Sequence, residues 1–214
     1  MGFELANIVP SVISALAGLG GVVAGGIMTT RREEAREQER RSREAAYVAT
    51  IMSTHLDHFV NGCVATAGDD GTDEGQPAGP DQVEHVPTTQ APEFEPHAAT
   101  GLDWKSLPPA LLDRIYLLPL QIAQLDRELN EIHRVDYDPP DHWPYFSHRR
   151  YGYAKLGLSA IQLVRDLRSE VGLSVEFDSI PILDHEHYLT TVMAHVAERL
   201  QAIKDARGRS PIIL

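Results

Sequence analysis

The feature that most constrains this chain is a long uncharged run near its amino terminus. Residues 5–30 read LANIVPSVISALAGLGGVVAGGIMTT and contain no Asp, Glu, Lys or Arg. A helix of about 20 apolar residues crosses the hydrocarbon core of a bilayer, which is about 30 Å thick. A helix buried in a soluble protein seldom reaches this length without a polar face. The run therefore predicts a transmembrane anchor at residues 1–30.

A cleaved signal peptide is the main alternative for this run, because residues 15–17 (ALA) resemble a cleavage site. No Lys or Arg precedes the run, however, and it continues well past that point to Met28. Basic residues near a membrane helix tend to stay on the cytoplasmic side. We therefore expect a single-pass protein of the cell inner membrane, with the amino terminus outside and the C-terminal domain in the cytoplasm. The arginines that set this orientation are Arg31, Arg32, Arg36, Arg40, Arg41 and Arg43.

Small residues recur along the uncharged run at the spacing of one helix face. Ala17, Gly21 and Gly25 follow one another every four positions. In lipid, small residues allow two helix backbones to approach closely, so this face is a candidate for self-association. Glycine is also common in membrane helices without such a role. A packed face would support an alternative function, a membrane-active oligomer that forms a pore or lesion.

A charged segment at residues 31–46 follows the run. The pairs Glu37–Arg41 and Glu39–Arg43 are four residues apart, in the order that favours a helix. Each such pair adds about 0.2–0.5 kcal/mol to the stability of an isolated helix. We expect a helical stalk whose arginines lie in solvent, and a contact with anionic lipid headgroups is the alternative.

Beyond the stalk, the spacing of apolar residues predicts a helical bundle. A stripe that includes Tyr47, Met52 and Phe59 recurs at three- and four-residue steps. This periodicity predicts a first bundle helix over residues 47–63. Asn61-Gly62 is a favourable pair for a left-handed cap, so we expect the helix to end there.

An acidic segment separates that helix from the rest of the chain. No Lys or Arg lies between Glu44 and Lys105, and Gly and Pro recur throughout residues 64–103. This composition is typical of a flexible loop. Phe94 is the side chain expected to hold the loop to the bundle.

The remaining bundle helices are expected over residues 104–207, before a short tail at 208–214. Three segments there have apolar residues at helical spacing, and Asp184 is the expected N-cap of the last. Pro119 falls inside the first segment and is expected to kink or split it. The predicted fold class is all-α: one N-terminal transmembrane helix that continues into a stalk, and a cytoplasmic bundle of about four helices.

Two histidines are candidate metal ligands. His55 and His58 are three residues apart on a predicted helix, so both imidazoles can share one face. They also neighbour the apolar stripe, which suits histidines at the edge of a bundle that bind no metal.

A basic, aromatic cluster is the other candidate site, and it comprises Arg149, Arg150, Tyr151 and Tyr153. Such clusters can hold phosphates or stack bases. In an acidic protein, an intramolecular partner is the stronger expectation, and the acidic segment at residues 69–95 is the candidate for it.

Residues 103–119 (DWKSLPPALLDRIYLLP) and 138–160 (DPPDHWPYFSHRRYGYAKLGLSA), with the motif APEFEP at 91–96, resemble a group of small bacterial single-pass membrane proteins with a helical cytoplasmic domain. The resemblance covers most of residues 1–172. It implies the same layout of anchor, acidic loop and helices. It implies no activity and no catalytic residues.

Composition and motifs narrow the function. The chain has 31 acidic and 19 basic residues, a net charge of −12, which argues against nucleic acid as the main partner. One cysteine allows no internal disulfide. The sequence contains neither a phosphate loop nor a nucleophile elbow, so we predict no cofactor and no enzymatic activity.

We predict a membrane-anchored helical adaptor or scaffold. Its expected partners are the lipid bilayer and either itself or another membrane protein. The alternatives are the membrane-active oligomer and a metal-binding enzyme or sensor that uses His55 and His58.

Overall fold

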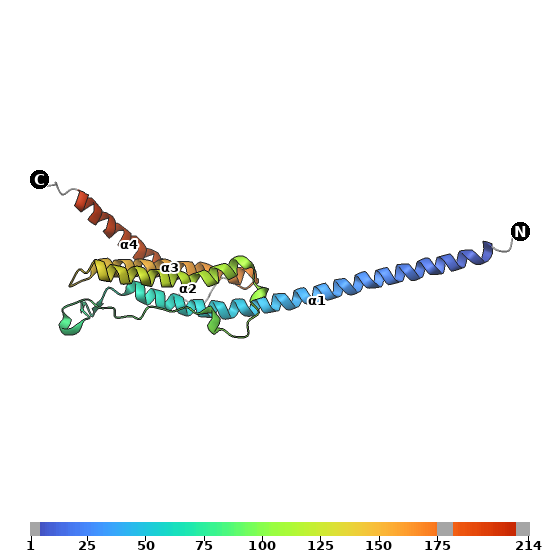
Figure 1. Ribbon diagram of the computed structural model, residues 1–214, viewed down its shortest axis with the longest axis horizontal. Helices are drawn as coiled ribbons and strands as arrows, with labels where there is room; N and C mark the ends of the chain where they lie inside the picture. The colour runs from blue at the N-terminus through green and yellow to red at the C-terminus, as the bar shows by residue number, and fades with distance from the viewer. Residues whose placement is uncertain (1–4, 175–181, 209–214) are drawn as a thin grey trace. The chain divides into compact units, whose positions relative to one another are not determined.

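The computed structural model is mostly helical, with almost no strand among the described residues, which confirms the all-α prediction (Figure 1). The structure describes residues 5–174 and 182–208; at 5–30, 182–183, 203–204 and 206–208 it describes the helical backbone alone. The chain divides into two compact units, Met1–Glu44 and Ala45–Leu214.

Four α-helices account for most of the described residues. A two-stranded antiparallel ribbon lies in the connection between the first two helices, with β1 at Thr72–Asp73 and β2 at Gln76–Pro77. Short 3-10 turns complete that connection at Pro80–Gln82, Pro96–Ala98 and Trp104–Ser106. The helices are α1 (Leu5–Gly68), α2 (Pro109–Val135), α3 (Trp143–Glu170) and α4 (Ile182–Gly208).

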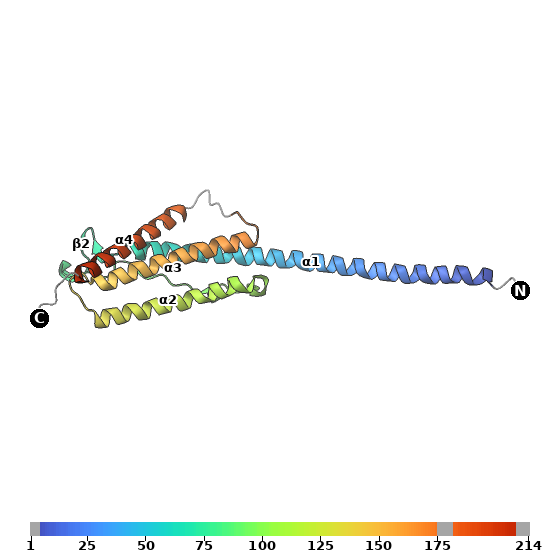
Figure 2. The ribbon, with the colours of Figure 1, turned by 90° about the horizontal axis from the view of Figure 1, so that it is seen from above.

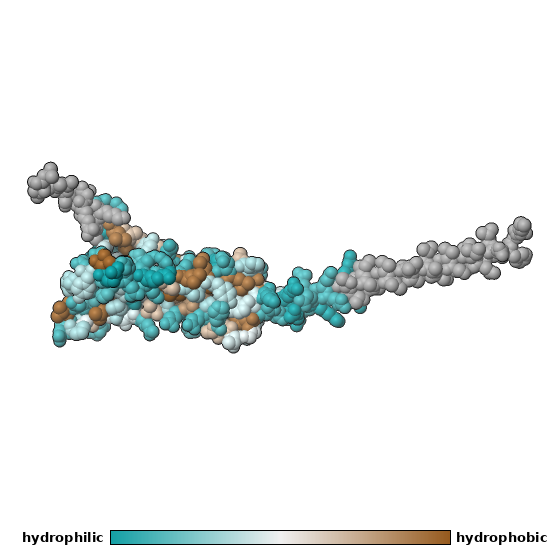
Figure 3. Space-filling view, in the orientation of Figure 1, coloured by the Kyte–Doolittle hydropathy of each residue, from teal (hydrophilic) through white to brown (hydrophobic). Residues whose placement is uncertain are grey.

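In the first unit, residues 31–44 of α1 form a hydrophilic helix surface (Figure 3). Both predicted ion pairs form there: Arg41 Nε lies 2.9 Å from Glu37 Oε1, and Arg43 pairs with Glu39. Arg40 lies 2.9 Å from Glu37 and 2.7 Å from Glu44. Ion pairs therefore connect successive helical turns of the stalk, as the spacing of its Glu and Arg residues predicted.

In the part of the chain that the structure describes, no helix is both long and apolar enough to cross a membrane. The predicted anchor at residues 1–30 lies outside the residues whose side chains are described, and so does its small-residue face of Ala17, Gly21 and Gly25. Both stay predictions.

The second unit has one apolar core to which all four helices contribute. α3 packs against both α2 and α4 (Figure 2). Gly157 of α3 lies where three helices approach closely, because a Cβ placed on it would lie 3.0 Å from Cys63 Cβ on α1 and 2.7 Å from Leu189 Cδ1 on α4. Three helices meet at this glycine because it has no side chain.

The first bundle helix extends further than expected. α1 continues past Asn61-Gly62 to Gly68, so the predicted end at residue 63 is wrong. Gly62 is instead required by close packing. A Cβ at this position would lie only 2.5 Å from Pro92 Cβ, in the connection between α1 and α2. The glycine that resembled a helix cap is where the connection crosses the helix surface.

Pro119 lies inside α2 without dividing it, since the helix is a single element over Pro109–Val135. A proline removes one hydrogen bond of the helical ladder. Ile115, whose carbonyl loses that bond, and Ile122, about one turn beyond Pro119, are both buried in the core. This packing holds the two halves of α2 in one helix.

The acidic connection between α1 and α2 packs onto the bundle. Phe94 is buried, and its ring centroid lies 5.9 Å from that of Phe59 on α1, which confirms the contact predicted for it. Leu107, near the end of the connection, is also buried in the core. Residues 64–68, expected to open the loop, form the last turn of α1.

Candidate functional site

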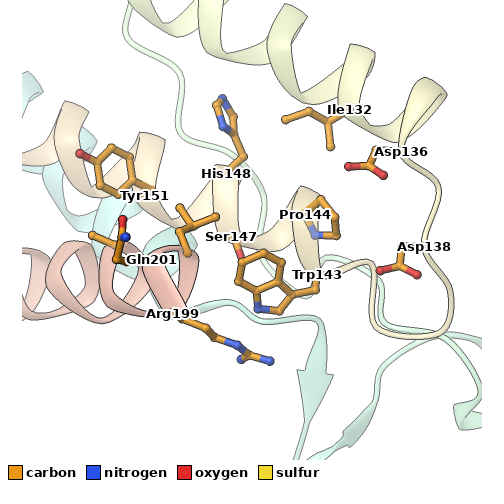
Figure 4. Close-up of a pocket in the computed structure, with 12 residues that line it drawn as sticks. Ile132, Asp136, Asp138, Trp143, Pro144, Ser147, His148, Tyr151, Arg199 and Gln201 are labelled. Atoms are coloured by element: carbon orange, nitrogen blue, oxygen red, sulfur yellow. The ribbon is translucent and has the colours of Figure 1, made fainter. Parts of the chain in front are cut away.

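A pocket of about 790 Å³ lies where the end of α2, the start of α3 and the C-terminal part of α4 meet. Two aromatic side chains, Trp143 and Tyr151, and three charged ones, Asp136, Asp138 and Arg199, are among the residues that line it (Figure 4). The residues that define its chemistry are Asp136, Asp138, Trp143, Ser147, Tyr151 and Arg199.

The aromatic wall follows from helical spacing on α3. Trp143, Ser147 and Tyr151 are separated by four residues each, which places them on one face over two turns. Trp143 is the first residue of α3, and Pro144 occupies the first turn, where its missing N–H costs no hydrogen bond. The start of α3 therefore places the indole of Trp143 in the lining of the pocket.

The acidic side of the pocket comes from the connection between α2 and α3. α2 ends at Val135, so Asp136 and Asp138 lie just beyond the helix, exposed to solvent. Figure 4 shows these two side chains on the opposite side of the pocket from Tyr151. Within the described residues, neither carboxylate forms an ion pair.

α4 contributes a cation to the pocket. Arg199 Cζ lies 5.2 Å from the centroid of the Trp143 ring, a distance at which the ring attracts a positive charge. Arg199 is exposed, so solvent can reach its guanidinium while it lies on the indole. The face of Trp143 is thus already a cation-binding surface.

A buried ion pair holds the acidic connection to α3 next to the pocket. Arg149 Nη1 donates to Asp69 Oδ2 at 2.7 Å, and the two side chains are 3% and 0% exposed. Arg149 Nη2 also donates to the Thr89 carbonyl at 2.7 Å. The predicted intramolecular contact between the basic cluster and the acidic segment is therefore present.

Asp69 is satisfied on both of its carboxylate oxygens. Oδ1 accepts from the Gly71 N–H, and Oδ2 accepts from the Thr88 and Thr89 N–H groups and from the Thr89 hydroxyl. Burial by itself would raise the pKa of Asp69, but the hydrogen bonds from Thr89, Gly71 and Arg149 outweigh it and lower the pKa to about 2. The carboxylate stays ionised at neutral pH and links Gly71 to Thr88 and Thr89, which lie further along the connection.

The rest of the basic cluster separates into different roles. Arg150 Nε donates to the Ala67 carbonyl at 2.9 Å and so caps the last turn of α1. Tyr153 is buried and donates its hydroxyl to Asp126 Oδ1 at 3.0 Å. Burial and the nearby Asp126 raise the pKa of Tyr153 above its ordinary value. Of the four predicted cluster residues, Tyr151 is the one that lines the pocket.

His55 and His58 lie on the exposed side of α1. Among the described residues, no group of three or more His, Cys, Asp or Glu side chains is arranged to hold a metal ion. Cys63, one turn further along, is buried, and burial raises the pKa of its thiol well above the ordinary range. The part of the chain that is described thus offers His55 and His58 no further ligands.

An aromatic and histidine cluster lies beside the pocket, at the same end of the bundle, and sequence reasoning did not single out its members Glu84, His133 and Tyr137. The ring centroids of Tyr137 and His142 are 4.8 Å apart, and His133 lies 6.1 Å from His142. His142 Nε2 is 3.7 Å from Glu84 Oε2. These residues come from three separate segments, so their spacing along the chain does not predict that they meet. The one local signal is that Tyr137 and His142 flank the Pro139-Pro140 turn.

No protein-family model, curated protein or solved structure matches this chain. The resemblance to a group of small bacterial membrane proteins therefore stays a prediction. The functional argument rests on the residues of this chain.

Proposed function

We propose that this protein is a membrane-anchored adaptor. Residues 5–30 hold it in the inner membrane as a single-pass anchor with the amino terminus outside, and the helical unit that begins at Ala45 binds a partner in the cytoplasm. The observation that carries the proposal is the continuity of α1, whose backbone is helical from Leu5 to Gly68. Its 26 uncharged residues, at 1.5 Å each, span about 39 Å, more than a bilayer core of about 30 Å.

The stalk arginines support the proposed orientation. The three furthest from the uncharged run, Arg40, Arg41 and Arg43, pair with glutamates of the same helix. In the described part of the chain no ion pair involves the three nearest to it, which are Arg31, Arg32 and Arg36. Unpaired arginines at this position suit the cytoplasmic headgroup region, where anionic lipids attract them.

The surface between α2 and α3 supports the adaptor role. A groove of about 380 Å³ runs between these helices, and Leu117 and Leu120 line it. Leu117 and Leu120 are 42% and 65% exposed, so both present apolar surface to a partner. A shallow apolar groove between two helices accommodates the apolar face of a further helix, so we propose an amphipathic helix of another protein as the partner.

Membrane extraction of the full-length chain tests the anchor. The wild-type protein should stay in the membrane pellet after alkaline carbonate treatment. The variant Leu16→Arg with Leu19→Arg should be released, because each arginine costs about 2.5–3.5 kcal/mol near the centre of a membrane helix. The matched control, Leu16→Ile with Leu19→Ile, should stay in the pellet. Release of the wild-type protein would refute the anchor.

A single-cysteine series tests the orientation, because the chain has one native cysteine. In a Cys63→Ala background, Gly2→Cys should react with a membrane-impermeant maleimide in spheroplasts of intact inner membrane. Glu33→Cys should react only after the membrane is opened. The reverse pattern would place the helical unit outside and would contradict the proposed topology.

A further inference from the structure

We infer that the pocket between α2, α3 and α4 binds an organic cation, a guanidinium or ammonium group that takes the place of Arg199 on the face of Trp143. This inference goes beyond the adaptor role and does not depend on the anchor. Three independent features of the pocket carry it: its aromatic wall, its charge and its size.

The aromatic wall already binds a cation of this kind. The guanidinium of Arg199 lies 5.2 Å from the ring centroid of Trp143. A tryptophan face is the best aromatic surface for a positive charge, and a second ring, that of Tyr151, lines the same pocket. Because Arg199 is an exposed side chain on α4, it can be displaced without opening the core. It therefore acts as an internal competitor for the site.

The charge of the pocket favours a cation over an anion. Asp136 and Asp138 line it without an ion pair in the described part of the chain. The other basic lining group, His148, is held by Glu128, whose Oε2 lies 2.9 Å from His148 Nε2. When a cationic ligand displaces Arg199, the positive charge of Arg199 no longer competes with the ligand for Asp136 and Asp138. An incoming anion would meet their repulsion.

The pocket has room for a ligand beside Arg199, which is one of its lining residues. Its volume of about 790 Å³ falls in the range of small-molecule sites, about 300–1,000 Å³. This space is free of protein atoms, including those of Arg199. A ligand can therefore place its cation on Trp143 and extend an alkyl chain toward Ile132 and Leu200, which also line the pocket.

Fluorescence titration of the full-length chain in an uncharged detergent tests this inference. The chain has two tryptophans, so Trp104→Phe leaves Trp143 as the only reporter. The probe is butylguanidinium, and its matched control is butylurea, which has the same shape without the charge. We expect butylguanidinium to change the Trp143 emission with a saturable curve and butylurea to bind at least fivefold more weakly. Equal binding of the two probes would overturn the inference.

Two variants in the Trp104→Phe background should shift the affinity in opposite directions. Arg199→Ala removes the competitor and should tighten butylguanidinium binding about fivefold, the size of one cation–aromatic contact. Asp136→Asn with Asp138→Asn should weaken it at least fivefold. All of these side chains are exposed or partly exposed, and circular dichroism should show unchanged helix content. If Arg199→Ala weakened binding or left it unchanged, the arginine would not be a competitor and the inference would fail.

The same titration separates two sources of the cation. The peptide acetyl-Gly-Arg-Gly-amide carries the guanidinium as a protein side chain, whereas butylguanidinium is a free small molecule. Tighter binding of the peptide would support the basic side chain of a protein partner as the occupant. Tighter binding of butylguanidinium would support a free metabolite-sized cation.

Discussion

Arginine and carboxylate side chains pair in two very different regions of this molecule, the stalk and the interior of the bundle. On the stalk, Arg41 and Glu37 are 70% and 43% exposed. In the bundle, Arg149 and Asp69 are 3% and 0% exposed. The heavy-atom distances are similar, 2.9 Å and 2.7 Å. The difference between the two pairs therefore lies in their surroundings.

Those surroundings decide what each pair does. An exposed pair exchanges water contacts for a weak attraction and is worth about 0–1 kcal/mol. A buried pair gains little net stability, but removal of one partner leaves an uncompensated charge and costs about 3–5 kcal/mol. The stalk pairs favour a helix that is already set by its composition. The Arg149–Asp69 pair determines where the acidic connection lies.

The largest expected effect comes from breaking the buried pair. Arg149→Met should lower the free energy of unfolding by about 3–5 kcal/mol, because Asp69 and the Thr89 carbonyl lose their buried donor. Urea unfolding followed by circular dichroism measures this change. Arg43→Met on the stalk is the matched control, with an expected loss below about 1 kcal/mol. Equal losses in the two variants would show that burial does not separate the two regions.

A second, smaller effect is expected at Gly62, where the acidic connection crosses α1. Gly62→Ala should lower the free energy of unfolding by about 1–3 kcal/mol, because the new Cβ meets Pro92 at 2.5 Å. Asn61→Ala, the exposed neighbour on the same helix, should change stability by less than about 0.5 kcal/mol. A stabilised Gly62→Ala variant would mean that the connection is not held against α1.

The pH dependence of stability sharpens the comparison further. The pKa of Asp69 is lowered to about 2 in the folded chain, against an ordinary value of about 3.9 when unfolded. The unfolded state therefore takes up this proton first as pH falls, and the stability from Asp69 is present above about pH 4 and lost toward pH 2. Urea midpoints of the wild type should fall over that window. In Asp69→Asn, which lacks this titration, the slope should be shallower.

The smallest expected effect is a difference in salt sensitivity. Hydrogen bonds from Arg40 and Arg41 lower the pKa of Glu37 on the stalk to about 2, the same value as for Asp69. Glu37 lies in solvent, where salt screens its neighbours, so 1 M NaCl should move its pKa back toward the ordinary value. Asp69 should shift much less. Carboxyl carbon NMR titration measures both, and equal salt shifts would contradict the burial argument.

Much of the fold is a local property of the chain. Apolar residues at three- and four-residue steps predicted the core side of α2, and Leu111, Ile115, Leu118 and Ile122 are indeed buried. The stalk pairs followed from spacing in the same way, because both partners lie on one helix. Such predictions succeed because the 3.6-residue repeat fixes which side chains share a face.

Predictions from local patterns failed where the surroundings of a residue depend on segments distant in the sequence. Tyr47 fits the apolar stripe of α1 but is 60% exposed, because no segment among the described residues covers it. Gly62 resembles a helix cap but is a crossing point for Pro92. The pattern around these residues is the same whether or not another part of the chain packs against them.

The candidate site depends most on contacts that no local pattern records. Spacing alone established an all-α chain, an acidic connection and a basic cluster for which that connection was the expected partner. Packing selected Asp69 as the partner of Arg149 and brought Asp136, Trp143 and Arg199 from three segments to one pocket. Helix periodicity acts over a few residues, whereas the burial of charge and the meeting of helix ends depend on the whole folded unit.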